Sequence, residues 1–228
     1  MSIKSVVKKL FSIENNAYVR NRWVEMKLKQ IQNNSIILDA GCGTQQYKKY
    51  CTHLQYRAQD FGQYDGSGDN HGLQDFEWNY GKLDYIGDIW NINEKDSTFD
   101  TILCTEVLEH IPFPNETIKE FSRLLKKNGH LILTAPFCSI PHQTPYYFYN
   151  GFSKYWYERM ANVYDFEIIE IVQNGNPTDY VLQELLRLTD NKLKQLFVRF
   201  MIPLIRKFLQ VEDKSYLHYG YQVFMKKI

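Results

Sequence analysis

The stretch IILDAGCG, residues 36–43, is an apolar run that stops at Asp39 and continues with Gly41 and Gly43 on either side of a cysteine. A short apolar run closed by glycine is typical of a buried strand. Glycines at the end of such a strand let a ligand lie against the bare backbone. The stretch therefore predicts a strand that ends in a ligand-binding turn, and we expect this turn to lead into a helix.

Segments with the character of strands and helices alternate on both sides of this stretch. Within residues 115–129, Asn115 is expected to cap a helix and Gly129 to stop it. The alternation predicts an α/β fold with a mostly parallel sheet, which binds ligands at the carboxyl ends of its strands. The expected strands are 54–60, 83–89, 99–104, 130–137, 166–172 and 219–228, and the expected helices are 3–32, 115–129 and 151–164.

The length and composition of the chain limit the number of domains and the kinds of binding partner to expect. The 228 residues suit one domain large enough to bury a core. With 27 basic and 26 acidic residues, the net charge of +1 gives no electrostatic support for binding nucleic acid. The four cysteines form no CxxC pair, and charges interrupt the N-terminal residues too often for a signal peptide. We therefore expect a reduced, cytoplasmic protein.

Two more acidic residues close the strands that follow. Asp60 ends the strand 54–60, where a carboxylate can accept hydrogen bonds from both hydroxyls of a ribose. Asp88 ends the strand 83–89, in a place to hold an exocyclic amine. Dinucleotide enzymes of the G-x-G-x-x-G type carry a third glycine, but Gln46 stands at that place here. This difference argues against a nicotinamide oxidoreductase.

Five motifs in this order resemble the class I S-adenosylmethionine-dependent methyltransferases. The resemblance implies a Rossmann-like α/β fold, with a seven-stranded, mostly parallel sheet, an antiparallel last strand and helices on both faces. It also implies S-adenosylmethionine as the cofactor. The motifs are ILDAGCG within 36–43, YRAQD at 56–60, LDYIGDI at 83–89, FDTILCTEVLEHIPFP at 99–114 and LLKKNGHLILTAPF at 124–137.

The same resemblance assigns cofactor contacts to residues at the strand ends. Asp60 would take the ribose hydroxyls, and Asp88 with Ile89 would frame the adenine. Thr105 would face the sulfonium side. The full set of expected cofactor-binding residues is Asp39, Gly41, Cys42, Gly43, Asp60, Phe61, Asp88, Ile89 and Thr105.

Candidate catalytic residues follow the fourth and fifth strands. Glu106, Glu109 and His110 stand at i, i+3 and i+4, so one helical turn would bring them to one face. His142 follows the fifth strand, on the neighbouring loop. A neutral imidazole is available as a general base near pH 7, and we expect His110, His142 and Glu106 to be catalytic.

The same four residues offer an alternative chemistry. Glu106, Glu109, His110 and His142 together could bind a divalent ion, as the same motif does in some class I enzymes that methylate quinones and small RNAs. The ion would bind two oxygens of the acceptor and acidify one of them. Two histidines would suit Mn²⁺, Fe²⁺ or Zn²⁺ better than Mg²⁺. We favour the metal-free base over this alternative.

Aromatic residues crowd the segment after the fifth strand. Rings with hydroxyl tips suit a sugar or a flat aromatic acceptor, and we expect His142, Tyr146, Tyr147 and Tyr149 to bind the substrate. The pattern H-x-x-P-Y-x-F-Y-x-G-F at residues 142–152 resembles bacterial methyltransferases of cell-surface glycan pathways.

We divide the chain into a helical cap at residues 1–33 and a methyltransferase domain at 34–228, with a helical insertion at about 179–211. Within the insertion, residues 192–209 are basic and amphipathic. Such a segment can form a lid, contact a second subunit in a homodimer, or lie on a membrane surface.

The sequence therefore predicts a cytoplasmic methyltransferase for a small molecule or a sugar, acting at oxygen and serving a surface-polysaccharide pathway. Two alternatives stay open. One is a metal-assisted O-methyltransferase of a quinone or an RNA, and the other is a binding protein that has kept the fold and lost the activity.

Overall fold

A computed structural model of the chain describes residues 15–69, 71–75, 77–189, 191–208 and 217–228. The predicted helix at 3–32 is observed as α2, Asn16–Leu28, and the side chain of Asn15 caps its first turn. The part of that prediction before residue 15 lies outside the described residues, as does the end of the predicted insertion at 209–211.

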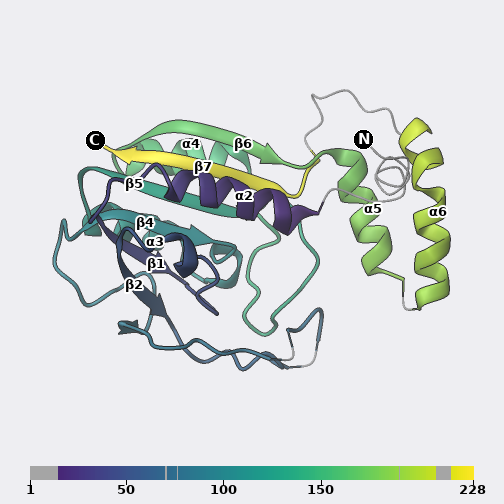
Figure 1. Cartoon of the computed structure of the whole chain (residues 1–228), viewed down its shortest axis with the longest axis horizontal. Helices are drawn as coiled ribbons and strands as arrows, with labels where there is room; N and C mark the ends of the chain where they lie inside the picture. Colours follow the sequence, from purple (N-terminus) through teal and green to yellow (C-terminus); the bar gives the residue numbers. More distant parts are fainter. Residues whose placement is uncertain (1–14, 70, 76, 190, 209–216) are drawn as a thin grey trace.

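Seven strands form one sheet in the order β3-β2-β1-β4-β5-β7-β6. Strands β1 to β5 pair in parallel, and β7 runs antiparallel to both of its neighbours, β5 and β6. Figure 1 shows β7, in yellow, beside β6. The predicted fold class is confirmed. The strands are β1 Ile36–Ala40, β2 Gln55–Asp60, β3 Tyr85–Ile86, β4 Phe99–Thr105, β5 Leu125–Pro136, β6 Phe166–Asn174 and β7 Gly220–Lys227.

Helices cover both faces of this sheet, because alternate residues of the central strands point to opposite sides. Leu38 of β1 and Ile102 of β4 pack in a core with α3 and α4. Ile37 and Leu103, their neighbours in sequence, pack in a second core with Trp23 of α2. The other described helices are α3 Pro114–Leu124, α4 Lys154–Val163, α5 Pro177–Arg187 and α6 Lys192–Phe208, and the short 3-10 helices are η1 Lys48–Tyr50 and η2 Leu108–His110.

Two helices, α5 and α6, form a hairpin in the region of the predicted insertion. Helices α5 and α6 pack on each other beyond the end of the sheet (Figure 1). Within the described residues, no helix has the length and the apolar character needed to cross a membrane.

Three predictions about helices are wrong, namely the helix after β1, the cap at Asn115 and the stop at Gly129. The turn after β1 leads into further turns and the 3-10 helix η1 rather than an α-helix, so no helix N-terminus stands beside Gly43. The helix predicted at 115–129 begins at Pro114, whose fixed φ suits a first helical position, and Phe113 rather than Asn115 precedes it. The Asn115 side chain instead accepts a hydrogen bond from Trp156 Nε1 at 3.0 Å.

Gly129 lies in β5 rather than at the end of a helix. A side chain there would come within 2.9 Å of the Lys126 carbonyl oxygen and 3.0 Å of that of Asp100. The register between β4 and β5 shifts next to this point, and the shift leaves no room for a Cβ atom. Gly129 is therefore explained by close backbone packing.

Candidate active site

The turn after β1 and the end of β2 are joined by the carboxylate of Asp60. Gly43 N donates a hydrogen bond to Asp60 Oδ2 at 2.9 Å, and Gly62 N donates to Oδ1 at 3.2 Å. Burial raises the pKa of Asp60, and these backbone hydrogen bonds oppose the rise. Asp60 therefore lies beside the glycine turn, with both carboxylate oxygens accepting hydrogen bonds from backbone N–H groups.

Protein side chains approach both glycines of this turn. Gly41 has φ +68°, and a Cβ there would lie 2.5 Å from a methyl carbon of Val107. Gly43 has φ +49°, and a Cβ there would lie 2.8 Å from the ring of Trp78. The glycines are required by positive φ and by these contacts. We had expected the approach of a ligand to be the only reason for these glycines, but the protein's own side chains also require them.

Asp39 and Cys42 lie under the turn rather than on its surface. Asp39 is buried, and its Oδ2 accepts a hydrogen bond from the Tyr56 hydroxyl at 2.5 Å. Burial raises the pKa of Asp39 to about 7. Burial also raises the pKa of the Cys42 thiol well above its usual range, so this cysteine stays protonated. Both residues are therefore buried in the folded chain.

The raised pKa of Asp39 predicts how stability changes with pH. Between about pH 4 and pH 7 the unfolded chain loses the Asp39 proton while the folded chain keeps it, so ionisation destabilises the fold as pH rises. We expect Asp39→Asn to gain on the order of 4 kcal/mol of unfolding free energy relative to wild type across this range. Urea unfolding at several pH values measures the difference.

Asp65→Asn is the matched control for that experiment. Asp65 is an exposed carboxylate whose pKa is lowered by hydrogen bonds from Ser67, so its replacement should not reproduce the gain. Parallel curves for wild type and Asp39→Asn between pH 4 and pH 7 would contradict the buried, protonated state of Asp39.

The end of β3 borders a hollow of about 380 Å³. Asp88 lines it together with Ile86 and Asn91, so an acid, an apolar side chain and an amide meet there. Ile89 packs in the core instead, and it does not share this surface with Asp88. Cavities of roughly 300–1,000 Å³ are the usual size of ligand pockets.

Two further predicted cofactor residues lie apart from this hollow. Phe61 follows Asp60, and its ring contacts that of Tyr146 edge to face at 4.9 Å between centroids. Thr105 is the last residue of β4 and pairs with Thr134 of β5.

Sequence reasoning missed two residues at this edge. Gln59 connects the two neighbouring strand ends, because its Oε1 accepts from Gly41 N at 3.1 Å and its Nε2 donates to the Gly87 carbonyl at 2.7 Å. Trp78 comes from the long connection between β2 and β3 and covers Gly43. The signal for Trp78 was the length of this connection and its aromatic residues, since a loop that long must pack on something.

Glu109, His110 and His142 form a cluster at the carboxyl ends of β4 and β5. The Nε2 atoms of His110 and His142 lie 3.8 and 3.9 Å from Glu109 Oε1, and the two rings are 4.7 Å apart between centroids. Each histidine donates its Nδ1 hydrogen to a backbone carbonyl, His110 to Tyr146 at 2.6 Å and His142 to Ile140 at 3.0 Å. Both Nε2 atoms therefore keep a free lone pair when the rings are neutral.

Glu109 is fully buried, and the two histidines beside it are partly buried. Both Glu109 carboxyl oxygens are buried without a hydrogen-bond partner among the described residues, and so is His110 Nε2. Burial raises the pKa of Glu109 well above its usual range, and Glu106 raises it further. Burial, with a smaller contribution from His142, lowers the pKa of His110 to about 4. The cluster thus favours a neutral imidazole, and an added cation would favour the ionised carboxylate.

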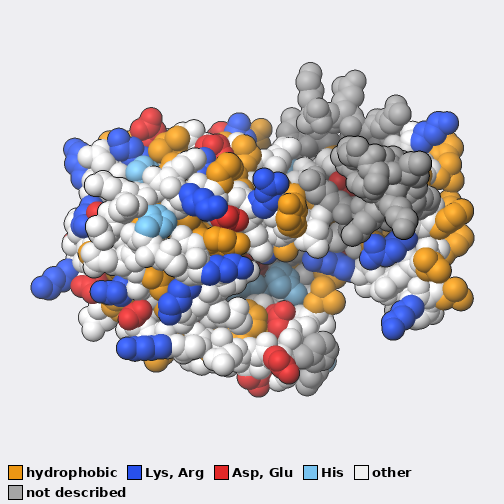
Figure 2. Space-filling view, viewed as in Figure 1, with side chains coloured by type: hydrophobic (Ala, Val, Ile, Leu, Met, Phe, Trp, Pro, Cys, Tyr) orange, Lys and Arg blue, Asp and Glu red, His pale blue; other side chains and the backbone are white. Residues whose placement is uncertain are grey.

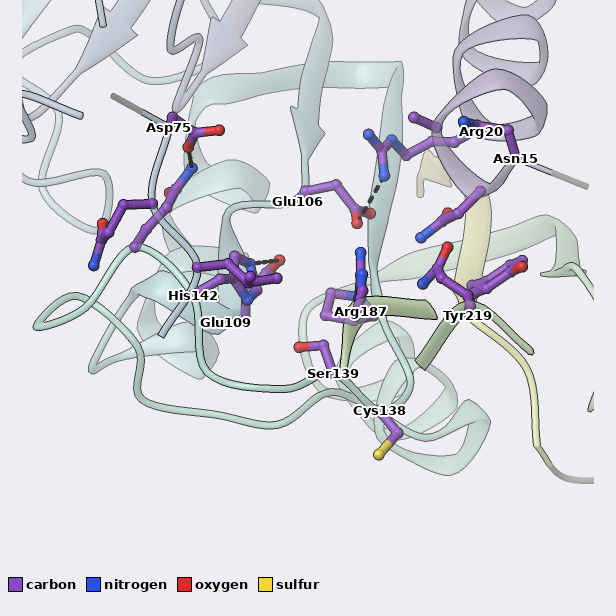
Figure 3. Close-up of a pocket in the computed structure, with 17 residues that line it drawn as sticks. Asn15, Arg20, Asp75, Glu106, Glu109, Cys138, Ser139, His142, Arg187 and Tyr219 are labelled. Carbon is purple, nitrogen blue, oxygen red and sulfur yellow. Dashed lines mark hydrogen bonds and ion pairs between the residues drawn. The ribbon is translucent and has the colours of Figure 1, made fainter. Parts of the chain in front are cut away.

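Glu106 lies outside this cluster, contrary to the spacing argument. Its φ is +53°, so the helical turn begins only after it, at η2. Its Oε2 pairs with Arg20 Nη1 of α2 at 2.9 Å, and its Oε1 accepts from the Thr134 hydroxyl at 2.9 Å. Figure 3 shows Glu106 turned toward Arg20. Of the four predicted residues, Glu109, His110 and His142 therefore form the cluster. Glu106 instead forms an ion pair with Arg20.

A cavity of about 410 Å³ lies between these two groups. Glu109 and His142 line one side and Arg20 with Glu106 another, and α5 contributes Arg187 (Figure 3). The cavity is also lined by Asn15, Asn16, Ala17, Leu73, Gln74, Asp75, Pro136, Cys138, Ser139, Gln143, Gln183 and Tyr219. This lining is mainly polar, whereas we had expected an aromatic pocket.

The predicted substrate tyrosines support the cavity wall instead of lining it. The Tyr146 carbonyl accepts the hydrogen bond from His110. The Tyr147 hydroxyl donates to the Ser139 carbonyl at 2.6 Å, and the Tyr149 hydroxyl donates to that of Pro112 at 3.2 Å. Of the four predicted substrate residues, only His142 reaches the cavity.

Comparison with known proteins identifies the family. A family model described as a methyltransferase domain matches residues 15–171. The chain belongs to this methyltransferase family. The predicted class, the S-adenosylmethionine-dependent class I methyltransferases, is thereby confirmed.

Among curated proteins, the methyltransferase is similar to the ubiquinone biosynthesis O-methyltransferase of Xanthomonas oryzae pv. oryzae. The two are 43% identical over 42 residues, and this match spans 18% of each chain. The chain thus matches less than a fifth of that relative's length.

Two solved structures share the fold. One is a SAM-dependent methyltransferase from Archaeoglobus fulgidus, with a TM-score of 0.57 and 14% identity, covering 93% of this chain and 97% of the other. The second is a phosphoethanolamine N-methyltransferase from Haemonchus contortus in complex with phosphomonomethylethanolamine and S-adenosylhomocysteine. Its TM-score is 0.51 at 15% identity, covering 91% of this chain and 52% of the other.

The residues at the sheet edge fit the family's cofactor. Asp60 places a two-oxygen acceptor beside the glycine turn, as a ribose requires, and the hollow at Asp88 joins an apolar surface to polar groups, as a base requires. Three residues could also hold a divalent ion, because Glu109, His110 and His142 each offer one ligand atom and these atoms lie within 4.8 Å of one another. Their Nδ1 hydrogens are held by backbone carbonyls, which is common for histidines that bind metals.

Proposed function

We propose that this methyltransferase transfers the methyl group of S-adenosylmethionine to a hydroxyl group of a small, polar acceptor. The observation that carries the proposal is His142, which lines the cavity beside Glu109 and whose Nε2 is not used by the hydrogen bond that its Nδ1 makes. A base within reach of the acceptor is needed for a hydroxyl, which must lose its proton as the methyl group arrives. The ubiquinone biosynthesis relative, an O-methyltransferase by name, supports oxygen as the acceptor atom.

Each group in the cavity has a distinct task in this reaction. The cofactor supplies an electrophilic methyl group on a sulfonium, which leaves as a neutral thioether. His142 Nε2 accepts the hydroxyl proton while the new oxygen–carbon bond forms. His110 and Glu109 position His142 through the packing of the two rings and the carboxylate at 3.9 Å. Holding the acceptor in line can supply roughly 7–11 kcal/mol of the barrier.

The polar lining supports a sugar or another polyol more than a flat aromatic acceptor. Amides, hydroxyls and two arginines surround the cavity and offer hydrogen bonds to several hydroxyl groups. A surface-polysaccharide precursor remains our preferred acceptor class on this ground. The described cysteines are all free, which supports a cytoplasmic location.

A second candidate is a metal-assisted reaction, which the geometry of the cluster favours more than the sequence did. Glu109 is fully buried with no hydrogen-bond partner in the described part of the chain, and the Nε2 atoms of His110 and His142 lie 3.8 and 3.9 Å from its Oε1. Bound there, a divalent ion would lower the pKa of an acceptor hydroxyl. The nitrogen ligands would suit Mn²⁺, Fe²⁺ or Zn²⁺ better than Mg²⁺. An acceptor with two adjacent oxygens would fit this reaction.

Methyl transfer from labelled S-adenosylmethionine to a panel of acceptors tests both candidates. The panel contains a hexose, a catechol, a simple phenol and a primary amine, each assayed with EDTA and with Mn²⁺. We expect label on hydroxyl acceptors. Label that survives EDTA supports the base mechanism, and label that needs the ion supports the metal candidate. Label on the amine alone, or on no acceptor at all, would contradict O-methylation.

A further inference from the structure

Helix α6 exposes an apolar stripe on the outer edge of the molecule. Leu193 is 77% exposed, Phe197 66% and Phe208 79%. Leu196 and Leu204 belong to the same stripe, because each of these residues is separated from another by three, four or seven positions and they therefore share one face of the helix. Figure 2 shows hydrophobic side chains gathered along this edge. A stripe of this size is unusual on a surface that meets only water.

The opposite face of α6 is already used by the protein. Val198 and Ile202 are buried, and Arg206 pairs with Asp179 of α5 at 2.7 Å. The helix therefore does not need its exposed stripe for packing within the described chain. The stripe is directed away from α5, and an external partner can reach it.

The charge on α6 indicates the chemistry of that partner. The helix carries basic residues and no acidic residue between Lys192 and Phe208. Figure 2 shows lysine and arginine side chains beside the hydrophobic ones at this edge. The exposed cations Lys192 and Arg199 lie on one border of the stripe, because they stand four residues before and three residues after Leu196. The basic residues of α6 are Lys192, Lys194, Arg199, Arg206 and Lys207.

We propose that α6 binds the surface of a bilayer rich in anionic phospholipid. Its apolar stripe would enter the boundary between headgroups and acyl chains, and its bordering cations would meet the lipid phosphates. A second copy of the chain is a poorer partner, because two such helices meeting face to face would bring together cations of the same sign. The inference is independent of the proposed reaction, since it rests on the outer face of α6 alone.

Binding of α6 to a bilayer would also place the cavity near the lipid surface, because α5 and α6 form one hairpin. The same hairpin supplies Gln183 and Arg187 of α5 to the wall of the acceptor cavity. A protein that lies on a bilayer through α6 therefore brings that cavity close to the lipid surface. Acceptors linked to a membrane lipid become accessible to it.

Co-sedimentation of the full chain with vesicles tests the proposal. One set of vesicles contains phosphatidylglycerol in phosphatidylcholine, and the other is phosphatidylcholine alone. We expect binding to the anionic vesicles that weakens between about 0.1 M and 0.5 M salt, because screening grows with ionic strength. Leu193→Ser with Phe197→Ser, and separately Lys192→Gln with Arg199→Gln, should each lower the apparent affinity about tenfold or more.

Matched controls carry the same changes elsewhere on the surface. Tyr155→Ser with Ile169→Ser replaces exposed apolar residues of α4 and β6, and Lys119→Gln with Lys154→Gln removes exposed charges. Both controls should bind as wild type does. Absence of binding to anionic vesicles, or equal binding by all variants, would overturn the proposal. So would a dimer in sedimentation velocity that Leu193→Ser with Phe197→Ser abolishes.

Discussion

Asp60→Asn is expected to weaken binding of S-adenosylhomocysteine by about 10²-fold or more. The carboxylate lies at the end of β2, where its two oxygens meet the N–H groups of Gly43 and Gly62. If ribose hydroxyls donate to these oxygens in the complex, each hydrogen bond to the charged group contributes roughly 1.5–3 kcal/mol. An amide keeps the shape, but it has one acceptor oxygen instead of two. Calorimetric titration measures the change in Kd.

Asp65→Asn, in the exposed turn a few residues later, is the matched control and should bind S-adenosylhomocysteine as wild type does. Thermal unfolding of Asp60→Asn separates lost binding from a lost fold, because the variant also disturbs two backbone hydrogen bonds. A folded Asp60→Asn protein with wild-type affinity would remove the ribose assignment.

His142→Ala is expected to lower turnover by about 10²–10⁴-fold, the usual contribution of a general base. Affinity for S-adenosylhomocysteine should stay within about twofold, because His142 lies in the acceptor cavity and not beside Asp60. Glu109→Gln should lower turnover as well, because Glu109 lies against both histidines. Initial rates and a binding titration on the same preparations make the comparison.

His71→Ala is the control for this pair, since His71 is exposed on the loop between β2 and β3. Its replacement should leave the rate unchanged. A normal rate for His142→Ala would mean that the acceptor needs no base from this side chain, and the proposed chemistry would be wrong. Equal losses of rate and cofactor affinity would instead mean that the variant damages the site as a whole.

The sheet and the acidic residues at its strand ends could be predicted, because each strand is marked by a pattern of neighbouring residues in the sequence. A buried strand needs a run of apolar residues, and β1, β4 and β5 each show one. The order of motifs then implied the topology, including the antiparallel β7. The strand predicted at 83–89 is observed as the two-residue strand β3, because an apolar pattern does not determine how many residues pair with the neighbouring strand.

The parts of the site that could not be predicted depend on contacts between distant segments. Nothing near Glu106 in sequence indicates that Arg20 of α2 pairs with it, or that its backbone has positive φ. The meeting of His142 with Glu109 was expected, because β4 and β5 are neighbours in this topology. Trp78 and Gln59 were missed, because their contacts with the glycine turn follow from loop packing and side-chain direction.

The most direct measurement is the calorimetric titration of wild-type protein with S-adenosylhomocysteine, run with EDTA and then with Mn²⁺. We propose that the edge formed by the glycine turn, Asp60 and Asp88 binds the cofactor. This claim predicts binding at one site per chain with EDTA present. A separate heat for Mn²⁺ that Glu109→Gln removes would show that the cluster of Glu109, His110 and His142 binds the metal. Absence of any heat from S-adenosylhomocysteine, with or without the ion, would contradict the claim.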